Sequence, residues 1–252
     1  MKKNHLIAVL CLFMTFIVST SAKASFYNYK TYTSNSFLFT ENLVGASLNT
    51  DAVYETLQLD EYGLEKTALD YAVKGYELLL NEGKVDNSQY LTIVDFSQPS
   101  NKRRFYLLDI DNKELVVNTY VMHGKNSGGV YAEKFSNVVD SYQSSLGFYV
   151  TKYTYYGSRG YSLRIDGLEE GFNTNAEKRG VVIHGSTYIN ESRARNGNIE
   201  RSLGCPALPT SDYKNVIKKI KNGSVMFIYH PNEEYLQKSP ILNEINGASE
   251  LI

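Results

Sequence analysis

From residue 90 onward the chain alternates short β-prone segments with turn residues, and this pattern restricts its fold more than any other feature. Seven segments have the length and the β-branched or aromatic content of strands. They are residues 90–96, 103–110, 114–122, 147–155, 161–165, 180–184 and 224–230. The second and third are joined by Asp111-Asn112-Lys113, which is typical of a hairpin turn. Short strands with frequent turns predict a mainly β fold, an antiparallel sandwich or barrel.

Two regions outside these segments have helical periodicity. In residues 49–82, apolar residues recur at three- and four-residue spacing, and Gly83 marks a helix end. This region predicts a small N-terminal helical extension. One late helix is predicted over residues 211–223, where apolar residues form a single stripe and Asn-Gly closes it. Residues 232–252 are mostly polar and predict a C-terminal tail.

The first 24 residues predict a secretory signal peptide. Lys2 and Lys3 give a basic start, residues 6–18 form an apolar run of 13 residues, and Ala22-Lys23-Ala24 is a small-x-small cleavage site. The run is too short for a comfortable transmembrane helix, so no stable membrane span is expected after cleavage. The mature protein is therefore expected outside the cytoplasm.

Composition is that of an ordinary globular protein. Hydrophobic residues make up 42% and charged residues 21%, which argues against a disordered chain and against a multi-span membrane protein. The formal net charge is −1, and cleavage removes three lysines and no acidic residue, leaving 23 basic against 27 acidic residues. Without a basic excess, no nucleic-acid partner is expected. The predicted layout is a signal peptide (1–24), a linker with the helical extension (25–89), a β-rich domain (90–231) and the tail (232–252).

One cysteine is left after cleavage, because Cys11 lies in the predicted signal peptide. Cys205 therefore has no partner for a disulfide within the mature chain. A lone thiol in an exported protein is either buried and inert or retained for its chemistry. Composition alone leaves both interpretations open.

A histidine and this cysteine occur in glycine-flanked motifs 21 residues apart. His184 ends an apolar segment and precedes Gly185, and a strand end can hold a side chain at a cleft. Gly204, just before the thiol, permits close approach of the backbone, and N–H groups around Leu203, Gly204 and Cys205 can hold an oxyanion. An imidazole can take the thiol proton and leave the more nucleophilic thiolate. The pair therefore suits acyl transfer.

The residues around this pair resemble a known family. Ile183-His184-Gly185 followed by Ser202-Leu203-Gly204-Cys205 is similar to the signature of YkuD-type L,D-transpeptidases, and most similar to the murein L,D-transpeptidase catalytic-domain family. Further similar motifs follow in order, at residues 123–128 (HGKNSG), 134–137 (KFSN), 141–148 (SYQSSLGF), 161–168 (YSLRIDGL) and 201–209 (RSLGCPALP). The resemblance runs from about residue 90 to about residue 230. It implies a YkuD-like β fold and an L,D-transpeptidase-like catalytic domain over residues 90–231.

The resemblance also implies a mechanism. Cys205 attacks the carbonyl that joins the L-centre of a stem-peptide diamino acid to a terminal D-alanine, and the acyl group then passes to the side-chain amine of a second stem. Water as the acceptor gives L,D-carboxypeptidase activity instead. His184 acts as base and then as acid, the Gly185 carbonyl orients it, and the Gly204 and Cys205 N–H groups hold the oxyanion. The sequence leaves open whether crosslinking, carboxypeptidase action or lipoprotein attachment dominates.

Other residues of the motifs are candidates for substrate contact. They are Arg201, Ser202, His123, Ser144, Ser145, Arg164 and Tyr188. The chain departs from the wider family pattern at Leu203, where histidine is frequent, and at Ala207, where asparagine or arginine is usual. Polar support for the cysteine must then come from elsewhere, with Arg201, Arg164 and Ser202 as the candidates.

The implied partners are peptidoglycan stem peptides, in the periplasm or the extracellular cell wall. Carbapenems, which mimic the stem peptide, are expected to acylate Cys205. No metal-ligand spacing such as His-x-His or Cys-x-x-Cys occurs, so neither a metal site nor a cofactor is predicted.

Two other functions compete with this interpretation. A sortase-like transpeptidase is also β-rich and exported, with histidine before cysteine, but the 21-residue spacing and the Gly-Cys-Pro context argue against it. The non-enzymatic alternative is a degenerate cell-wall-binding module with a vestigial pair, which Leu203 and Ala207 favour.

Overall fold

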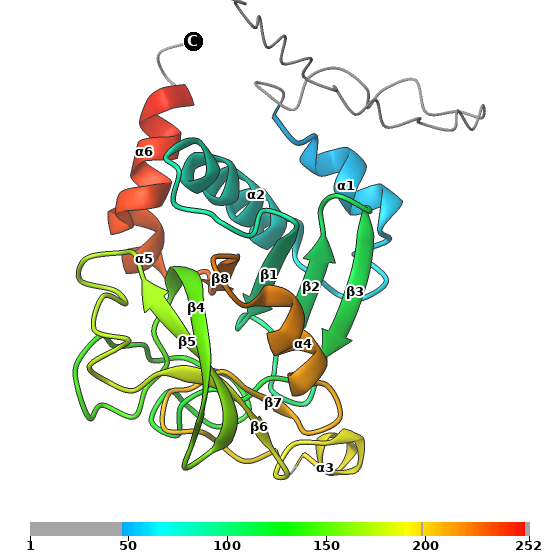
Figure 1. Ribbon diagram of the computed structural model, residues 1–252, viewed down its shortest axis with the longest axis vertical. Helices are drawn as coiled ribbons and strands as arrows, with labels where there is room; N and C mark the ends of the chain where they lie inside the picture. The colour runs from blue at the N-terminus through cyan, green and yellow to red at the C-terminus, as the bar shows by residue number, and fades with distance from the viewer. Residues whose placement is uncertain (1–46, 198, 250–252) are drawn as a thin grey trace, which may run out of the picture. The chain divides into compact units, whose positions relative to one another are not determined.

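The computed structural model describes residues 47–197 and 199–249. The predicted signal peptide and the linker up to residue 46 lie outside the described residues. The described residues belong to one compact unit, which is built on a single eight-stranded sheet with helices packed around it (Figure 1). The mainly β architecture predicted from the sequence is confirmed, in the form of one continuous mixed sheet.

The strand order across the sheet is β3-β2-β1-β8-β4-β5-β6-β7. The strands are β1 (Tyr90–Asp95), β2 (Phe105–Asp109), β3 (Glu114–Thr119), β4 (Gly147–Gly157), β5 (Gly160–Gly167), β6 (Val182–Ser186), β7 (Ala207–Pro209) and β8 (Val225–Tyr229). Seven of them correspond to the predicted segments. The sequence does not predict β7, because a three-residue strand that ends in proline is too short to show a pattern.

Most neighbouring strands are antiparallel, but two pairs are parallel. Leu91 of β1 lies opposite Val225 of β8, and His184 of β6 lies opposite Ala207 of β7. Parallel neighbours need a connection that returns to the same end of the sheet. The β6–β7 pair positions the site, because it brings the loop before β7 next to the strand that carries His184.

Helix α2 (Lys66–Asn81) packs on the sheet and helps to form its core. It contacts β1 and β8, and the ring of Tyr71 lies 6.3 Å from that of Tyr229. Gly75 lies against Phe148, where an added Cβ would be 2.1 Å from a ring atom, so only glycine permits this approach. The predicted helical extension is thus part of the same unit as the sheet.

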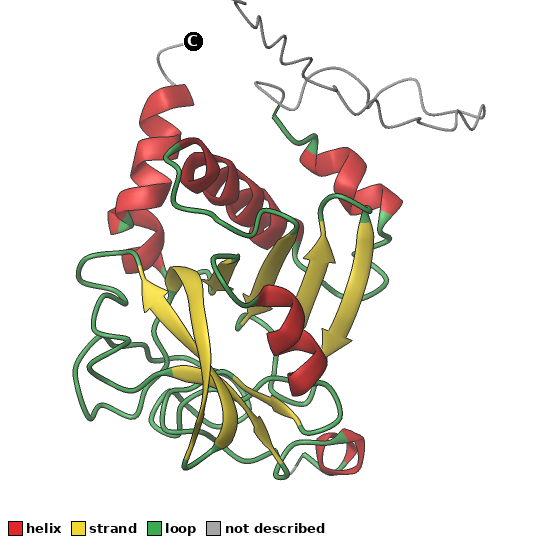
Figure 2. Cartoon of the chain, in the orientation of Figure 1, coloured by secondary structure: helices red, strands yellow, loops and turns green. Residues whose placement is uncertain are grey.

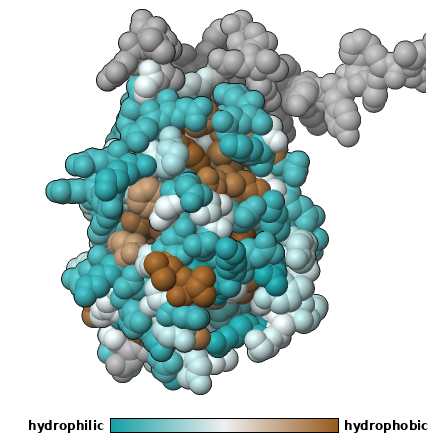
Figure 3. Space-filling model, turned by 90° about the vertical axis from the view of Figure 1, so that its left-hand side faces the viewer, coloured by the Kyte–Doolittle hydropathy of each residue, from teal (hydrophilic) through white to brown (hydrophobic). Residues whose placement is uncertain are grey.

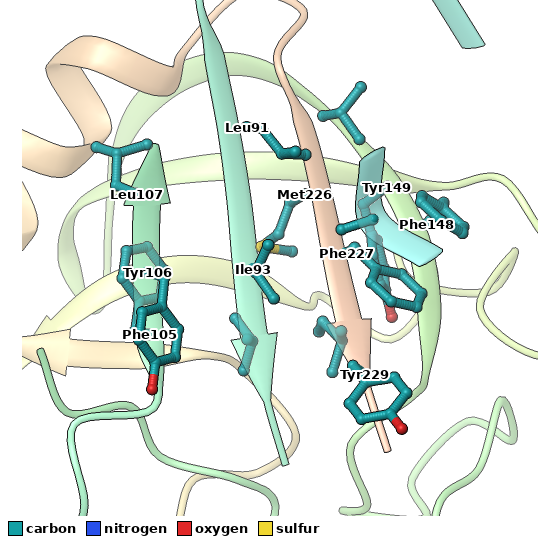
Figure 4. Close-up of a cluster of buried hydrophobic side chains, with 14 of the residues drawn as sticks. Leu91, Ile93, Phe105, Tyr106, Leu107, Phe148, Tyr149, Met226, Phe227 and Tyr229 are labelled. Carbon is teal, nitrogen blue, oxygen red and sulfur yellow. The ribbon is translucent and has the colours of Figure 1, made fainter. Parts of the chain in front are cut away.

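The main hydrophobic core lies between the strands at the centre of the sheet and the helices that cover them. Figure 4 shows Leu91 and Ile93 of β1 beside Met226 of β8, with aromatic side chains on either side. The rings of Phe148 and Phe227 stack with centroids 4.2 Å apart. Burial of this apolar surface is the main stabilising contribution to the fold.

The other helices are α1 (Thr50–Thr56), α3 (Glu191–Arg195), α4 (Tyr213–Ile220), α5 (Glu233–Lys238) and α6 (Pro240–Ser249) (Figure 2). Helix α4 confirms the predicted late helix. The segment predicted as a polar tail is helical instead. Its α5 and α6 bury Tyr235, Ile241 and Leu242 in the main core. The sequence does not predict these helices because their few apolar residues, among many polar ones, do not form a clear helical period.

Hydrophilic residues cover much of the face seen in Figure 3, and hydrophobic residues form separate patches among them. Large hydrophobic side chains that are exposed include Tyr156 of β4 and Leu203 beside the cysteine. Within residues 47–249, Asn198 aside, no helix combines the length and the hydropathy that a membrane crossing needs.

Candidate active site

Cys205 and His184 are brought to the same edge of the sheet by the parallel pair β6–β7 (lower part of Figure 1). Ala207 lies opposite His184, so Cys205 stands two residues before that point, in the loop that leads into β7. The half-buried thiol is directed at the Gly180 carbonyl oxygen, with an S···O distance of 3.7 Å. Among the described residues, no hydrogen bond joins the sulfur to the His184 ring.

The His184 ring is held in one tautomer. Its Nδ1 lies 2.9 Å from the Gly185 carbonyl oxygen. A carbonyl can only accept, so Nδ1 carries the proton and Nε2 has a free lone pair. This carbonyl is the orienting partner that the resemblance implies for His184. A side chain at Gly185 would not fit, because its Cβ would lie 2.6 Å from the Tyr213 ring.

Burial favours the neutral form of both reactive groups. Burial lowers the pKa of His184 below its ordinary 6.5; the Gly185 bond opposes this shift and the charge of Arg159 adds to it. Burial likewise raises the pKa of the Cys205 thiol above its ordinary 9.0, against the Val182 N–H group and the charges of Arg159 and Arg179. At neutral pH the resting pair is therefore a thiol and a neutral imidazole, and His184 is available as a base.

The loop before Cys205 requires its glycine. Gly204 has a φ of +117°, and a Cβ there would lie 2.8 Å from the Gln143 carbonyl oxygen. Two residues earlier in the motif, Ser202 forms a parallel bridge with Gly124 and donates its N–H to the His123 carbonyl at 2.9 Å. The cysteine loop is thus fixed between residues 123–125 and Gln143.

Of the three N–H groups predicted to hold an oxyanion, one is engaged within the loop. The Gly204 N–H donates to the Ser202 hydroxyl at 3.0 Å. The Leu203 and Cys205 N–H groups have no acceptor among the described residues. The Cys205 N–H, next to the attacking sulfur, is therefore the donor best placed for an oxyanion.

Arg179 is a residue of the site that sequence reasoning misses. Its guanidinium crosses from the start of β6 to the loop before β4, where it donates to several oxygens. These are the carbonyls of Ser136 (2.6 Å) and Gln143 and the hydroxyls of Ser141 (3.2 Å) and Ser145. Five fixed donors on a planar group suit this role of tying loops together.

Arg179 also acts on the cysteine loop. Its Nη2 lies 3.2 Å from the Cβ position that Gly204 leaves empty, and its charge lowers the pKa of Cys205. It therefore provides cationic support that Ala207 does not. In the sequence, Arg179 is only a polar residue next to Gly180, and an ordinary turn before a strand has the same pattern. The sequence therefore gives no indication of its role.

His123, a predicted substrate contact, is fully buried in the structure. Arg104 donates from Nη2 to its Nδ1 at 2.7 Å, which leaves Nε2 protonated and 3.3 Å from the Gly128 carbonyl. Burial, with the charges of Arg104 and Arg201, lowers the pKa of His123 to about 3. It is a neutral structural residue beneath the cysteine loop.

The two serines predicted to contact substrate, Ser144 and Ser145, are also buried. The Ser144 hydroxyl accepts from the Gly124 N–H at 3.0 Å, and the Ser145 hydroxyl donates to the Ser136 carbonyl at 2.8 Å. Neither hydroxyl is exposed at the surface. They hold the loops on which the cysteine loop rests.

The remaining predicted contact residues differ in the exposure of their side chains and in the partners that these side chains already have. Arg201 is half-buried and donates to the carbonyls of Gly129 and Ile199. The guanidinium of Arg164 lies over the Tyr155 ring at 5.1 Å, and its buried Nε has no partner among the described residues. Tyr188, beyond the end of β6, is exposed. Only Tyr188 presents an open surface.

Two cavities lie away from the pair. One, of about 390 Å³, is lined by residues of α5 and of the segments 135–137 and 170–172. The other, of about 590 Å³, runs along β3 and reaches Asn190 and Glu191. Neither is lined by Cys205 or His184. In the part of the chain that the structure describes, no group of three His, Cys, Asp or Glu side chains is arranged to hold a metal ion.

Fold and site together define a class of protein: a mainly β scaffold that presents a free thiol and a neutral histidine at one sheet edge. The family model described as the L,D-transpeptidase catalytic domain matches residues 60–229. The chain therefore belongs to the L,D-transpeptidase catalytic domain family. The match begins before α2, which agrees with the packing of this helix on the sheet.

Solved structures of L,D-transpeptidases are similar to the chain at low identity. One from Mycobacterium smegmatis is 12% identical, with a TM-score of 0.36, and the match covers 56% of this chain and 59% of that one. LdtMt1 in complex with imipenem is 13% identical over 56% and 59%, with a TM-score of 0.34. An L,D-transpeptidase from Stackebrandtia nassauensis is 16% identical over 64% and 65%, with a TM-score of 0.33. The chain spans about three fifths of the length of the first two. No curated protein sequence matches it.

Proposed function

We propose that the protein is an exported cysteine L,D-transpeptidase that acts on peptidoglycan stem tetrapeptides. Membership of the L,D-transpeptidase family supports the reaction class. The observation that supports Cys205 and His184 as the catalytic residues is the state of the His184 ring. The imidazole is neutral, its Nδ1–H donates to the Gly185 carbonyl, and its Nε2 is free. In the β6–β7 register it lies two residues from the level of Cys205. A base in this state can accept the thiol proton.

In the proposed acylation, the Cys205 thiol turns from Gly180 toward Nε2 of His184 and gives up its proton. The sulfur attacks the carbonyl carbon between the L-centre of the diamino acid and the terminal D-alanine. The Cys205 N–H donates to the oxygen that becomes negative. The imidazolium then returns its proton to the leaving nitrogen, so D-alanine departs as the amine and a thioester is left on Cys205.

In the proposed second step, the side-chain amine of another stem attacks the thioester. His184 takes a proton from that amine, the carbon–sulfur bond breaks, and the thiolate recovers the proton through the same imidazole. Water in place of the amine gives a tripeptide, which is the L,D-carboxypeptidase outcome. The same residues serve both acceptors.

The test is mass spectrometry of a disaccharide-tetrapeptide incubated with residues 25–252 and, in parallel, with Cys205→Ala. We expect a crosslinked dimer that has lost one D-alanine, formed by the wild type and lost by at least about 10³-fold in the variant. Tripeptide alone would identify water as the acceptor. Equal product with both proteins would exclude Cys205 as the nucleophile.

Acylation by a carbapenem is a second test of Cys205, again with the wild type and Cys205→Ala. LdtMt1 has been solved with imipenem, and a reactive Cys205 is proposed to form a similar adduct. Intact mass should increase by one carbapenem in the wild type and not in Cys205→Ala. An unchanged wild-type mass would argue against an accessible thiol.

The departures at Leu203 and Ala207 favour a second candidate, a cell-wall-binding module without catalysis. Arg179 weakens this alternative, because it places a cation beside the cysteine loop by another route. Binding of both proteins to purified cell wall, with no turnover by either, would favour the module. Recovery of the mature protein from the cell envelope, starting near residue 25, would test the proposed export.

A further inference from the structure

The carbonyl that fixes the His184 ring belongs to a glycine, the residue with the freest backbone. The Nδ1–H of His184 donates to the Gly185 oxygen across 2.9 Å, so the direction of this carbonyl decides which ring nitrogen carries the proton. A change in the backbone angles of Gly185 would turn the oxygen away from the ring. The Gly185 peptide must therefore be held in place if Nε2 is to stay free.

The strands hold Gly185 from one side only. Strand β6 pairs with β5 as far as His184, which lies opposite Ser162, and the pairing ends there. On the other side, Gly185 lies opposite Leu208 of β7, which is a strand of only three residues. Gly185 is thus the first residue of β6 beyond the end of its pairing with β5, so the sheet restricts it less than it restricts His184.

The ring of Tyr213, the first residue of α4, packs against Gly185 where the pairing with β5 has ended. A Cβ on Gly185 would lie 2.6 Å from Cδ1, 2.7 Å from Cε1 and 2.9 Å from Cγ of this ring. Three adjacent ring atoms at nearly equal distances mean that one side of the ring lies directly over the Gly185 Cα. Close packing of this kind limits the movement of the Gly185 backbone.

The helix that carries Tyr213 is itself fixed to the sheet. Asp212, the residue before Tyr213, accepts a hydrogen bond from the Thr119 hydroxyl at the end of β3. Three apolar residues of α4 are buried in the main core, Val216, Ile217 and Ile220. The ring of Tyr213 therefore presses on Gly185 from a rigid element.

We propose that Tyr213 is a positioning residue of the reaction: its ring holds the Gly185 carbonyl toward the imidazole and so keeps Nε2 of His184 free to take the thiol proton. The role in turnover rests on the proposed function, whereas the effect on the tautomer of the ring does not. The role is one of packing, so it requires the aromatic ring and not the hydroxyl.

The rival explanation is that Tyr213 only stabilises the fold, since it also packs against the main core. A stabilising residue changes the fraction of molecules that are folded, whereas a positioning residue changes the His184 ring in molecules that are folded. NMR of the imidazole nitrogens separates the two explanations, because protonated and unprotonated ring nitrogens have different chemical shifts. The tautomer is therefore read from the folded protein without any substrate.

The experiment compares the wild type with Tyr213→Leu and Tyr213→Phe at a pH where His184 is neutral. We expect the wild type to carry the His184 proton on Nδ1 and Tyr213→Leu to show a mixture of tautomers. For release of D-alanine from the disaccharide-tetrapeptide, Tyr213→Leu should lower kcat by at least about tenfold and leave KM within about twofold. Tyr213→Phe, which keeps the ring, should restore the tautomer and bring kcat within about threefold of the wild type.

Two controls accompany these variants. His123, whose ring is held by Arg104 and the Gly128 carbonyl, should keep its Nε2–H form in every protein and serves as the reference in each spectrum. Gly75→Ala, which the contact with Phe148 should destabilise, should keep the His184 tautomer and the kcat of the folded molecules. Tyr213→Met, with an unbranched side chain, replaces Tyr213→Leu if the latter does not fold.

An unchanged His184 tautomer in the folded variant would overturn the inference, whatever its activity. Equal losses of kcat in Tyr213→Leu and Gly75→Ala would overturn it in favour of a purely stabilising role. A mixture of tautomers in Tyr213→Leu, with no D-alanine released by the wild type, would overturn the proposed function while supporting the effect of Tyr213 on the ring.

Discussion

His184 is oriented by a backbone carbonyl, and this decides how the site responds to pH. A carbonyl holds the Nδ1 proton without adding a negative charge beside the ring. Among the described residues, no acidic side chain acts on the ring to stabilise an imidazolium, and burial lowers the pKa of His184. The thiol is also neutral at rest, because burial raises its pKa. The base and the nucleophile have to exchange a proton within the reaction rather than before it.

The pH profile of kcat/KM should show this resting state. Below the pKa of His184 the ring is charged and cannot take the thiol proton, so activity should fall as pH decreases through that value. Because the pKa is lowered, the acid limb should lie below pH 6.5. An acid limb at pH 7 or above would mean that the pKa of His184 is raised and not lowered.

The sequence predicts the reactive pair of the site but not the contacts that residues distant in the sequence make with it. The pattern around Cys205 and His184 indicates the reactive pair, since glycines and a strand end are local features. His123 occurs in an equally glycine-rich motif, yet Arg104, the residue before β2, contacts it and its side chain is buried. Arg179 and Arg159 act across distances in sequence that no local pattern contains.

At the scale of elements, the contact between α2 and β4 shows how a helix predicted as an extension becomes part of the core. Gly75 lets the Phe148 ring lie against the helix backbone. Apolar periodicity predicts that the helix exists and which face is buried. It does not predict the partner surface, because the residues of β4 and β8 that complete it are far away in the sequence.

Replacing Gly75 by alanine should destabilise the fold. The new Cβ would lie 2.1 Å from the Phe148 ring, and overpacking of this kind costs about 1–3 kcal/mol in free energy of unfolding. Thermal unfolding should show a Tm lower by several degrees, with activity per folded molecule unchanged. Gly247→Ala is the matched control: it is an exposed helical glycine with open space at its Cβ, and it should not lower the Tm. Equal effects would show that the contact with Phe148 is not tight.

For the strands too, the sequence predicts local structure but not the contacts between distant segments. Alternation and turn residues predict seven strands near their observed bounds, but they do not predict which of them pair. β1 and β8, about 130 residues apart, are parallel neighbours at the centre of the sheet. β7 exists only because β6 offers it a partner, and this pairing is what sets the cysteine loop beside His184.

At the scale of the whole molecule, the C-terminal helices are tied to the sheet through one buried carboxylate. Glu169, just after β5, accepts from the Phe148 N–H at 2.6 Å, from the Tyr235 hydroxyl at 3.0 Å and from the Ser239 hydroxyl. These donors come from β4, from α5 and from the residue that follows α5. A carboxylate buried in this way costs free energy unless all its donors stay in place. The segment that composition marks as a tail therefore completes a polar network as well as the core.

Tyr235 belongs both to the polar network of Glu169 and to the main hydrophobic core. Its removal should therefore destabilise the entire unit. The side chain is fully buried, with its ring 5.1 Å from that of Phe172. Tyr235→Ala should lower the free energy of unfolding by about 3–5 kcal/mol, and Tyr235→Phe, which loses only the donor to Glu169, by about 1–3 kcal/mol. Urea unfolding measures both. Tyr62→Ala, at an exposed tyrosine, should change stability by less than about 0.5 kcal/mol. If Tyr235→Ala behaves like Tyr62→Ala, the C-terminal helices do not stabilise the sheet, and the domain ends at β8.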